Sequence, residues 1–290
     1  MRAKPGCARV ARSLPDLPAE MPSPHPAFVD LHNHLVPGVD DGCADLPESL
    51  DALHALYAEG VRTLVATPHL LLPRLGTDAA IDSELDIQRR AFARLAERLE
   101  GARDVPTVGL GQEIWAPDAA ALRRVVARPD VGLGGSRTLL VEFGFDLTGT
   151  HMDVVRAAVE AGRGIVIAHP ERYAYPTGVE PLELMRRWRE HGALLQVNAG
   201  SFSGHYRDHR PMSEALAWAM VANRLVDIVA TDHHGPRRVG VSPLEAFGRL
   251  AARGEQALAL GAMVERPGAV LRDETGEEAA EAVRTPGAGA

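Results

Sequence analysis

The chain has 290 residues, of which 46% are hydrophobic and 24% charged, and this composition is ordinary for a soluble globular protein with one large α/β domain or two small ones. Its formal net charge of −8 argues against a general nucleic-acid binder, because such a protein needs a basic face. The two cysteines, Cys7 and Cys43, cannot build a disulfide framework or a thiolate zinc cluster, which favours a reduced, cytoplasmic protein.

The two ends of the chain are expected to lie outside the folded body. Residues 1–26 are rich in proline and show no hydrophobic periodicity, so they are interpreted as a disordered leader. They lack the apolar segment of a secretory signal, and no apolar run in the chain is long enough to insert into a membrane. Residues 272–290 are polar and small, as is typical of a flexible tail. The folded domain is therefore predicted over residues 27–271.

Short apolar runs alternate with amphipathic segments through this domain. The runs are rich in β-forming residues and predict strands at residues 28–31, 62–67, 106–111, 138–143, 164–169, 193–198 and 227–232. Helical spacing is found between them, over residues 46–59, 82–100, 117–127, 150–161, 180–191 and 212–223. Strands that alternate with helices predict parallel βαβ units. Because no GxGxxG motif follows the first strand, a closed or nearly closed barrel is favoured over a doubly wound sheet.

The ends of the predicted strands carry metal-binding side chains. His32 and His34 follow the first strand, and in an extended segment they point to the same side and form a chelating pair. Taken alone, this pair is equally well explained by two surface histidines. However, every later strand except the sixth also carries such groups at its end, namely His69, Glu113, Glu142, His169, Asp232 and His234. Barrel enzymes place their active sites at this edge.

Histidine and carboxylate without thiolate are ligands that suit zinc, manganese or iron. A purely structural interpretation would have to explain Glu142 and Asp232 separately, since a lone buried carboxylate is costly unless it is paired or metal-bound. The set is too large for one ion, so we predict two or three ions bridged by Glu113 and Glu142. Neighbouring ions lower the pKa of a bridging water and stabilise attacking and leaving oxygens, which favours a hydrolase of phosphate esters.

Several other residues have two interpretations. Asp40, Asp41 and Gly42 either form a turn or contribute a ligand. Arg172 follows His169 closely and is either a surface arginine or a bidentate clamp on phosphate oxygens. His54 lies on an apolar helical stripe, which predicts a core or boundary position. The remaining isolated histidines are expected to be helix-cap or surface groups; they are His151, His191, His205 and His209.

Neither cysteine begins the C-x5-R loop on which most tyrosine phosphatases depend. The position where the arginine would stand is Ser13 after Cys7 and Ser49 after Cys43. A thiolate mechanism of that kind is therefore excluded.

The motifs DLHNHLVPGVDDG, ATPH, GQEI, VEF, AHPERY and ATDHHG follow one another in this order. Together they resemble the PHP (polymerase and histidinol phosphatase) superfamily, over about residues 28–271. They are most similar to its bacterial protein-tyrosine phosphatases of capsule and exopolysaccharide synthesis. The resemblance implies a single-domain, distorted (β/α)7 TIM-like barrel with a three-metal site. Manganese is the ion expected there, with iron, zinc or magnesium as alternatives.

The resemblance also implies roles for single residues. The metal ligands would be His32, His34, Asp41, His69, Glu113, Glu142, His169, Asp232 and His234. Arg172 would hold the substrate phosphate and act in catalysis together with Asp41 and His234. A second substrate-binding arginine is expected after the last motif, at Arg237 or Arg238. Leu70 stands where many family members have a further histidine.

By this resemblance, the chain hydrolyses phosphotyrosine on a protein by attack of a metal-bridging hydroxide. The expected substrate is a tyrosine kinase of polysaccharide export. One alternative is a small-molecule phosphatase of the same superfamily, such as a histidinol-phosphate phosphatase. Another is a non-catalytic metal-binding or regulatory module, against which the complete ligand set argues. The HPER and DDG motifs favour the first function. No nucleic-acid partner or membrane insertion is expected, and a homo-oligomer is left open.

Overall fold

The computed structural model describes residues 25–236 and 241–274. Most of the expected leader and tail lies outside these residues, as do Cys7, Arg237 and Arg238. Within the part of the chain that is described, no helix is both long enough and apolar enough to cross a membrane.

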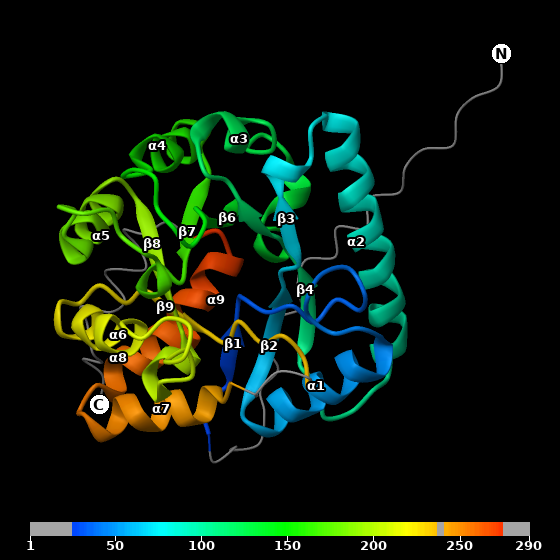
Figure 1. The fold of residues 1–290 in the computed structure, drawn as a ribbon. Coiled ribbons are helices and arrows are strands. Elements are labelled where there is room, and N and C mark those ends of the chain that lie inside the picture. The colour runs from blue at the N-terminus through cyan, green and yellow to red at the C-terminus, as the bar shows by residue number, and fades with distance from the viewer. Residues whose placement is uncertain (1–24, 237–240, 275–290) are drawn as a thin grey trace.

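The chain folds into one α/β domain in which every strand pairing is parallel (Figure 1). One sheet has the order β1-β2-β4, made of Phe28–Asp30, Val61–Ala66 and Thr107–Leu110. The other has the order β3-β5-β6-β7-β8-β9, made of His69–Leu71, Glu113–Trp115, Thr138–Glu142, Gly164–Ala168, Ala193–Asn198 and Ile228–Ala230. Parallel strands with helical connections were predicted from the alternating pattern, and this part of the prediction is confirmed.

The second and third predicted strands are present as β2 and β4, within one residue of the expected bounds at each end. Each is followed by a short strand that the sequence did not reveal. Pro68 has no amide hydrogen to donate, and β3 begins after it at His69, while β5 begins at Glu113, three residues after the end of β4 at Leu110. The pairing of β2 with β4 continues toward the pairing of β3 with β5, since the Gly111 amide between them donates to the Ala66 carbonyl over 2.8 Å. Glu113 thereby lies inside a strand and not after one.

The segments that follow β1 and β9 also lie side by side. The Asp232 amide donates to the His32 carbonyl and the His34 amide donates to the His233 carbonyl, each over 2.8 Å. Asn33 and His233 form a parallel bridge. The first and last strands therefore bring their carboxyl ends together, although they are at opposite ends of the sequence.

Helices surround the strands (Figure 1). The helices that the sequence predicts are all present: α1 Leu46–Ala58, α2 Asp78–Leu99, α3 Ala119–Arg123, α4 Met152–Glu160, α5 Pro181–Glu190 and α6 Ser213–Ala222. Only α3 is much shorter than expected. The chain then continues into three helices that the sequence pattern did not reveal: α7 Pro243–Ala252, α8 Gln256–Leu260 and α9 Arg266–Leu271. Among the short turns, η4 Pro170–Arg172 and η5 Ala199–Ser203 bear on the site described below.

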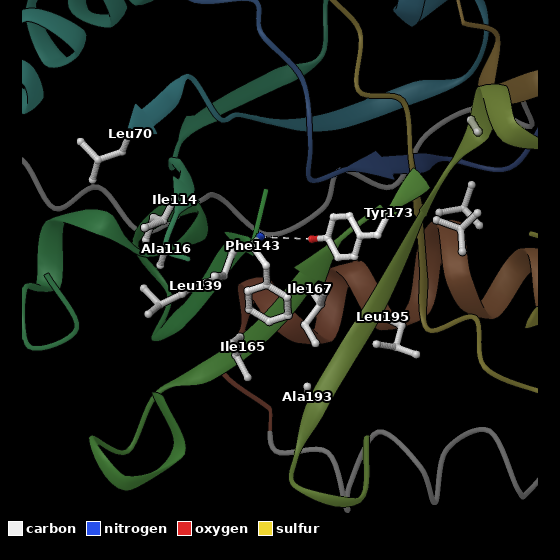
Figure 2. Packing of buried hydrophobic residues seen from close by; sticks show 14 of the residues in the cluster. Leu70, Ile114, Ala116, Leu139, Phe143, Ile165, Ile167, Tyr173, Ala193 and Leu195 are labelled. Carbon is white, nitrogen blue, oxygen red and sulfur yellow. Dashed lines mark hydrogen bonds between the residues drawn. The ribbon is translucent and has the colours of Figure 1, made fainter. Parts of the chain in front are cut away.

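Side-chain alternation along the strands builds two cores. Leu139 and Val141 of β6 point outward and pack with Ile165 and the helices, as Figure 2 shows for part of this cluster. Leu140 points the other way, into a smaller inner cluster that contains Val166 and other strand residues. Since alternate residues share a face, Glu142 points inward with Leu140. The same alternation directs the polar residues at strand ends toward the middle of the molecule.

Two histidines differ from the sequence prediction. His54 is exposed and its Nδ1 lies 3.0 Å from the Asp104 carbonyl oxygen, so the expected core position is wrong. The apolar face of α1 is formed by Leu53 and Leu56 instead. His151 does stand at the N-cap of α4, but its side chain makes no capping hydrogen bond. It is buried and stacks on Phe143, with ring centroids 4.8 Å apart.

Candidate metal centre

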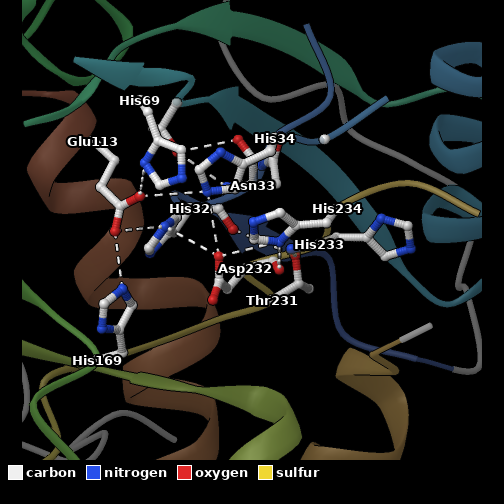
Figure 3. A network of polar contacts seen from close by, with 12 residues as sticks. His32, Asn33, His34, His69, Glu113, His169, Thr231, Asp232, His233 and His234 are labelled. Atoms are coloured by element: carbon white, nitrogen blue, oxygen red, sulfur yellow. Dashed lines mark hydrogen bonds and ion pairs between the residues drawn. The ribbon is translucent and has the colours of Figure 1, made fainter. Parts of the chain in front are cut away.

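Histidine and carboxylate side chains from all parts of the chain meet at the carboxyl ends of the strands (Figure 3). Their ligand atoms form overlapping groups in which all atoms lie within 4.8 Å of one another. The groups are His34, Asp41, His69 and His234; His32, His34 and Asp232; His32, Glu113 and His169; and His69, Glu113 and Glu142. Every residue that the sequence nominated as a ligand belongs to at least one of these groups.

Asp30 fixes the two strand ends that carry most of the histidines. It is buried at the end of β1, and one carboxylate oxygen accepts the Thr231 amide over 2.9 Å. The other oxygen accepts the Thr231 hydroxyl over 2.6 Å and the Asn33 side-chain amide over 3.2 Å. Asp30 thus holds the side chain of Asn33 on one face of the chain. Its neighbours His32 and His34 point to the opposite face, toward the centre, as the two-residue period requires.

Asp40 and Asp41 divide the two roles that the sequence left open. Asp40 is a turn residue that accepts the Gly42 amide over 3.0 Å. It also lies 2.8 Å from Nδ1 of His34 and so orients that ring. Asp41 is half-exposed and places Oδ1 3.3 Å from Nε2 of His69 and 3.6 Å from Nε2 of His234. Gly42 is required here, because a Cβ at this position would lie 1.9 Å from the His34 carbonyl oxygen.

The sixth predicted strand, β8, contributes amides that the sequence analysis missed. Gln196 places Oε1 2.9 Å from Nδ1 of His32, which leaves Nε2 of that ring to face the centre. Its amide nitrogen donates to Asn198 over 2.7 Å, and Asn198 donates to Asp232 over 2.7 Å. Two polar residues on the same face of the apolar run ALLQVN were the signal that could have identified them.

Glu113 lies in the middle of the histidines. Its Oε1 is 2.9 Å from Nε2 of His169, and its Oε2 is 2.8 Å from Nδ1 of His69. Nε2 of His32 and Nε2 of His34 approach the same carboxylate at 3.3 and 3.4 Å. Both of these nitrogens are buried and have no hydrogen-bond partner among the described residues. Buried imidazole nitrogens without partners, aimed at carboxylates, are the arrangement that a bound cation would complete.

The crowding of charges shifts the pKa values of the centre. Burial and the neighbouring Glu113 raise the pKa of Glu142 to about 8. Burial alone would lower the pKa of His34, but the carboxylates of Asp232 and Asp40 outweigh it and raise the pKa to about 9. Burial also disfavours protonation of His69, but Glu113 and Asp41 favour it and raise the pKa of His69 to about 11. Burial lowers the pKa values of His169 and His234, so the histidines of the centre differ in the protonation that they favour.

Arg172 stands at the edge of this centre, in η4. Its NH1 donates to Oδ2 of Asp232 over 2.6 Å. The guanidinium also packs against the rings of Tyr206 and Phe145, at 4.1 and 4.9 Å from their centroids. The side chain is only 15% exposed, so it is not an ordinary surface arginine. Arg237 and Arg238, the candidates for a second arginine, lie outside the described residues.

Glu171, the residue before Arg172, has a structural role that the sequence analysis did not identify. It is buried, and its Oε1 accepts hydrogen bonds from the backbone amide of Asn198 over 2.9 Å and from the Ser201 hydroxyl over 2.7 Å. Burial raises its pKa to about 7. Glu171 thus ties the HPER turn to the end of β8 and to η5, which fixes the backbone on both sides of Arg172.

Cys43 stands only two residues after Asp41 in the sequence. It is fully buried in the apolar core, and it belongs to none of the ligand groups. A Cβ at Gly235 would lie 2.8 Å from its sulfur, so the thiol packs against the backbone after the last motif.

Comparison with known proteins gives consistent matches. The family model described as capsular polysaccharide synthesis, CpsB/CapC, matches residues 28–250. The chain is 29% identical to the tyrosine-protein phosphatase YwqE of Bacillus subtilis, over 76% of this chain and 82% of that protein. It is 28% identical to the tyrosine-protein phosphatase CpsB of Streptococcus pneumoniae, over 71% of this chain and 83% of that protein. Crystal structures described as YwqE and CpsB, unique metal-dependent tyrosine phosphatases, include a chain that superposes with a TM-score of 0.70. That chain is 26% identical, and the match covers 86% of this chain and 96% of that one.

Proposed function

This chain belongs to the CpsB/CapC family of capsular polysaccharide synthesis, and we propose that it is a metal-dependent phosphatase that hydrolyses phosphotyrosine on proteins. The family membership confirms the resemblance found in the sequence motifs. The observation that carries the proposal is the meeting of buried imidazole nitrogens and carboxylates beside the mostly buried guanidinium of Arg172. A dianionic phosphate ester is the substrate class that such a centre suits best.

The donor set fits divalent cations. It consists of imidazole and carboxylate groups without thiolate, and the unpartnered Nε2 atoms of His32 and His34 are buried among them. The ligands in this proposal are His32, His34, Asp41, His69, Glu113, Glu142, His169, Asp232 and His234. Two or three divalent ions bound there would acidify a water molecule and polarise the phosphoryl oxygens.

Other side chains of the protein orient the proposed ligands and neutralise part of their charge. Gln196 and Asp40 hold the rings of His32 and His34, and Asn198 and Arg172 hold Asp232. Arg172 is assigned to the substrate phosphate, because its planar donors match two phosphate oxygens and stacking on Tyr206 keeps the group in place.

We assign Asp41 and His234 to catalysis as unprotonated groups, because contact with His69 lowers the pKa of Asp41 and burial lowers the pKa of His234 to about 4. They lie on the outer side of the centre, where Asp41 is half-exposed and lines an open cavity. Arg238, or its neighbour Arg237, is retained as a second phosphate contact.

Finer features belong to the same proposal. We infer that the two sheets together form a distorted (β/α)7 barrel, which is supported by the continuing hydrogen bonds at Gly111 and by the bridge between Asn33 and His233. We further propose that the ion is manganese, that the protein is cytoplasmic and that its substrate is a tyrosine kinase of polysaccharide export.

A substrate panel tests this function. The Mn²⁺-loaded protein should hydrolyse phosphotyrosine peptides and should act on histidinol phosphate at least about a hundredfold more slowly, a difference of about 3 kcal/mol in transition-state binding. The opposite preference would replace the proposal with a small-molecule phosphatase. No turnover of any phosphate ester by metal-loaded protein would favour a regulatory metal-binding module.

A further inference from the structure

A cavity of about 630 Å³ opens directly on the candidate metal centre. Asp41, His69 and Glu142 line the part that adjoins the centre. The apolar part of its wall is formed by Val39, Leu71, Leu75, Trp115 and Phe145, and Arg74 and Glu84 also line the cavity. Apolar walls combined with a few polar groups are the usual form of a site for a small ligand or a side chain.

Strand register explains how an apolar wall comes to adjoin the metal centre. His69 of β3 pairs with Glu113 of β5, and these two residues are in the ligand groups. Two residues further along the same strands, Leu71 pairs with Trp115, and Trp115 pairs with Glu142 of β6. Side chains two apart on a strand share a face. Trp115 and Leu71 therefore form the layer immediately outside His69 and Glu113, on the same face.

The edge of the Trp115 indole lies against the backbone that follows β6. Gly144 follows β6 with φ of +94°, and a Cβ there would lie 3.1 Å from Nε1 of Trp115. The backbone at Gly144 thus approaches the edge of the indole, and the next residue, Phe145, continues the cavity wall. Phe145 also packs against the guanidinium of Arg172. The cavity wall is in this way continuous with the residue assigned to the phosphate.

We propose that Trp115 is a specificity-determining residue that selects aryl phosphate esters, with its indole as the wall against which the substrate's aromatic ring packs. This inference rests on the phosphatase function proposed above. A phosphate held by the centre and Arg172 would direct the group that it esterifies into the cavity. An aromatic ring reaches and covers Trp115 and Leu71, whereas the short chain of a phosphoserine leaves this apolar surface in water.

A pair of inhibitors with the same anion isolates the ring. Phenylphosphonate and methylphosphonate share the phosphonate group and differ in the aryl substituent. Their binding to Mn²⁺-loaded protein is measured by calorimetry, which does not depend on turnover. Trp115→Leu should weaken phenylphosphonate about three- to tenfold, the usual effect of losing an aromatic contact, and should leave methylphosphonate within about twofold. Trp115→Phe, which restores a ring, should recover most of the loss.

Trp218 provides a matched control. It packs against Phe202 and Arg253 and does not line the cavity. Trp218→Leu should therefore leave both inhibitors unchanged.

Two results would overturn the assignment: an equal loss of both inhibitors in Trp115→Leu, which indicates a structural role, or unchanged phenylphosphonate binding. Turnover of a phosphotyrosine peptide by the same wild-type preparation tests the proposed function separately. Selective loss of phenylphosphonate in a protein that hydrolyses no phosphate ester would support the ring wall and contradict the phosphatase function.

Discussion

At the scale of the residue, the side chains behind the ligands decide how the ligands are presented. His32 contacts Gln196 and His34 contacts Asp40, so in each ring one nitrogen is already used and Nε2 faces the centre. Such supporting contacts fix the tautomer of a histidine and its orientation. One of them is local and the other is not, since Asp40 stands 6 positions after His34 and Gln196 stands 164 positions after His32.

Removing the carboxamide behind His32 should weaken metal binding. Gln196→Leu preserves the volume but leaves Nδ1 of His32 without an acceptor, and we expect metal affinity to fall about 10- to 100-fold, as is usual for such contacts. Gln196→Glu restores an acceptor and should lose less. Competition against a chromogenic chelator measures both. Unchanged affinity in Gln196→Leu would mean that the ring is oriented without this contact.

Arg172 should matter for turnover and not for metal binding. Arg172→Ala is expected to lower the turnover of phosphate esters about 10²- to 10³-fold, as does the loss of one charge stabiliser in other enzymes. Metal content should stay near that of the wild type, because the guanidinium is not a ligand and Asn198 still holds Asp232. Arg210→Ala is a suitable control, since Arg210 packs on the same Phe145 ring at 4.8 Å and carries no assigned role. Loss of metal in Arg172→Ala, or full activity, would contradict the clamp.

Metal binding should release protons. In the metal-free protein at pH 7 we expect Glu142, His34 and His69 to hold protons, since their pKa values are raised to about 8, about 9 and about 11. A divalent ion displaces these protons, so affinity should rise with pH until the pH passes these values and should fall on acidification. Calorimetry in buffers of different ionisation enthalpy counts the released protons. Tighter binding at lower pH would show that the assigned groups are not ligands.

The sequence predicted the charged residues of the centre better than the neutral ones. His, Asp and Glu at strand ends stand out, because buried charge in an apolar run needs a reason. Gln196, Asn198 and Trp115 did not stand out, since amides and aromatic rings occur in many cores. Their contacts depend on register between strands, which a single sequence does not contain.

At the scale of the element, the DDG turn is the part of the site that depends most on backbone geometry. Gly42→Ala would place a Cβ 1.9 Å from the His34 carbonyl oxygen, so the turn must move. We expect a loss of about 1–3 kcal/mol in the free energy of unfolding, together with weaker metal binding as Asp40 and Asp41 shift.

The loop glycine Gly76 gives the matched control for Gly42, because a Cβ there meets no atom within 4 Å. Gly76→Ala should change the free energy of unfolding by no more than about 0.5 kcal/mol. Denaturant unfolding measures both variants. Equal effects of the two substitutions would mean that the turn accommodates a side chain and does not position Asp40.

The strands and helices were predicted where the hydrophobic period is long and clear. The short strands β3 and β5 were missed, because each has only 3 residues and shows no clear alternation of its own. The C-terminal helices were missed for another reason. α8 and α9 are only 5 and 6 residues long, with a π-helical turn between them, so neither completes two turns of amphipathic pattern.

At the scale of the whole molecule, the metal centre lies on top of the inner core. Val29, Leu140, Val166 and Ile228 come from four different strands and pack together beneath it, with Val270 of α9. These contacts join the first strand to the last helix, so the end of the folded chain supports the middle of the site. This arrangement explains why motifs from almost the full length of the chain meet in one place.

The central claim is that phosphotyrosine hydrolysis requires divalent metal and does not require the thiol of Cys43, the cysteine next to the DDG motif. It is tested most directly by assaying a phosphotyrosine peptide with Cys43→Ala and wild-type protein, each before chelation, after removal of metal, and after addition of Mn²⁺. Cys43 is buried and outside the ligand groups, so the variant should act at close to the wild-type rate. Both proteins should lose activity on chelation and regain it with Mn²⁺, because the proposed reaction depends on divalent ions held by the histidines and carboxylates of the centre. Activity in metal-free protein, or an inactive Cys43→Ala variant that is folded and metal-loaded, would contradict the account.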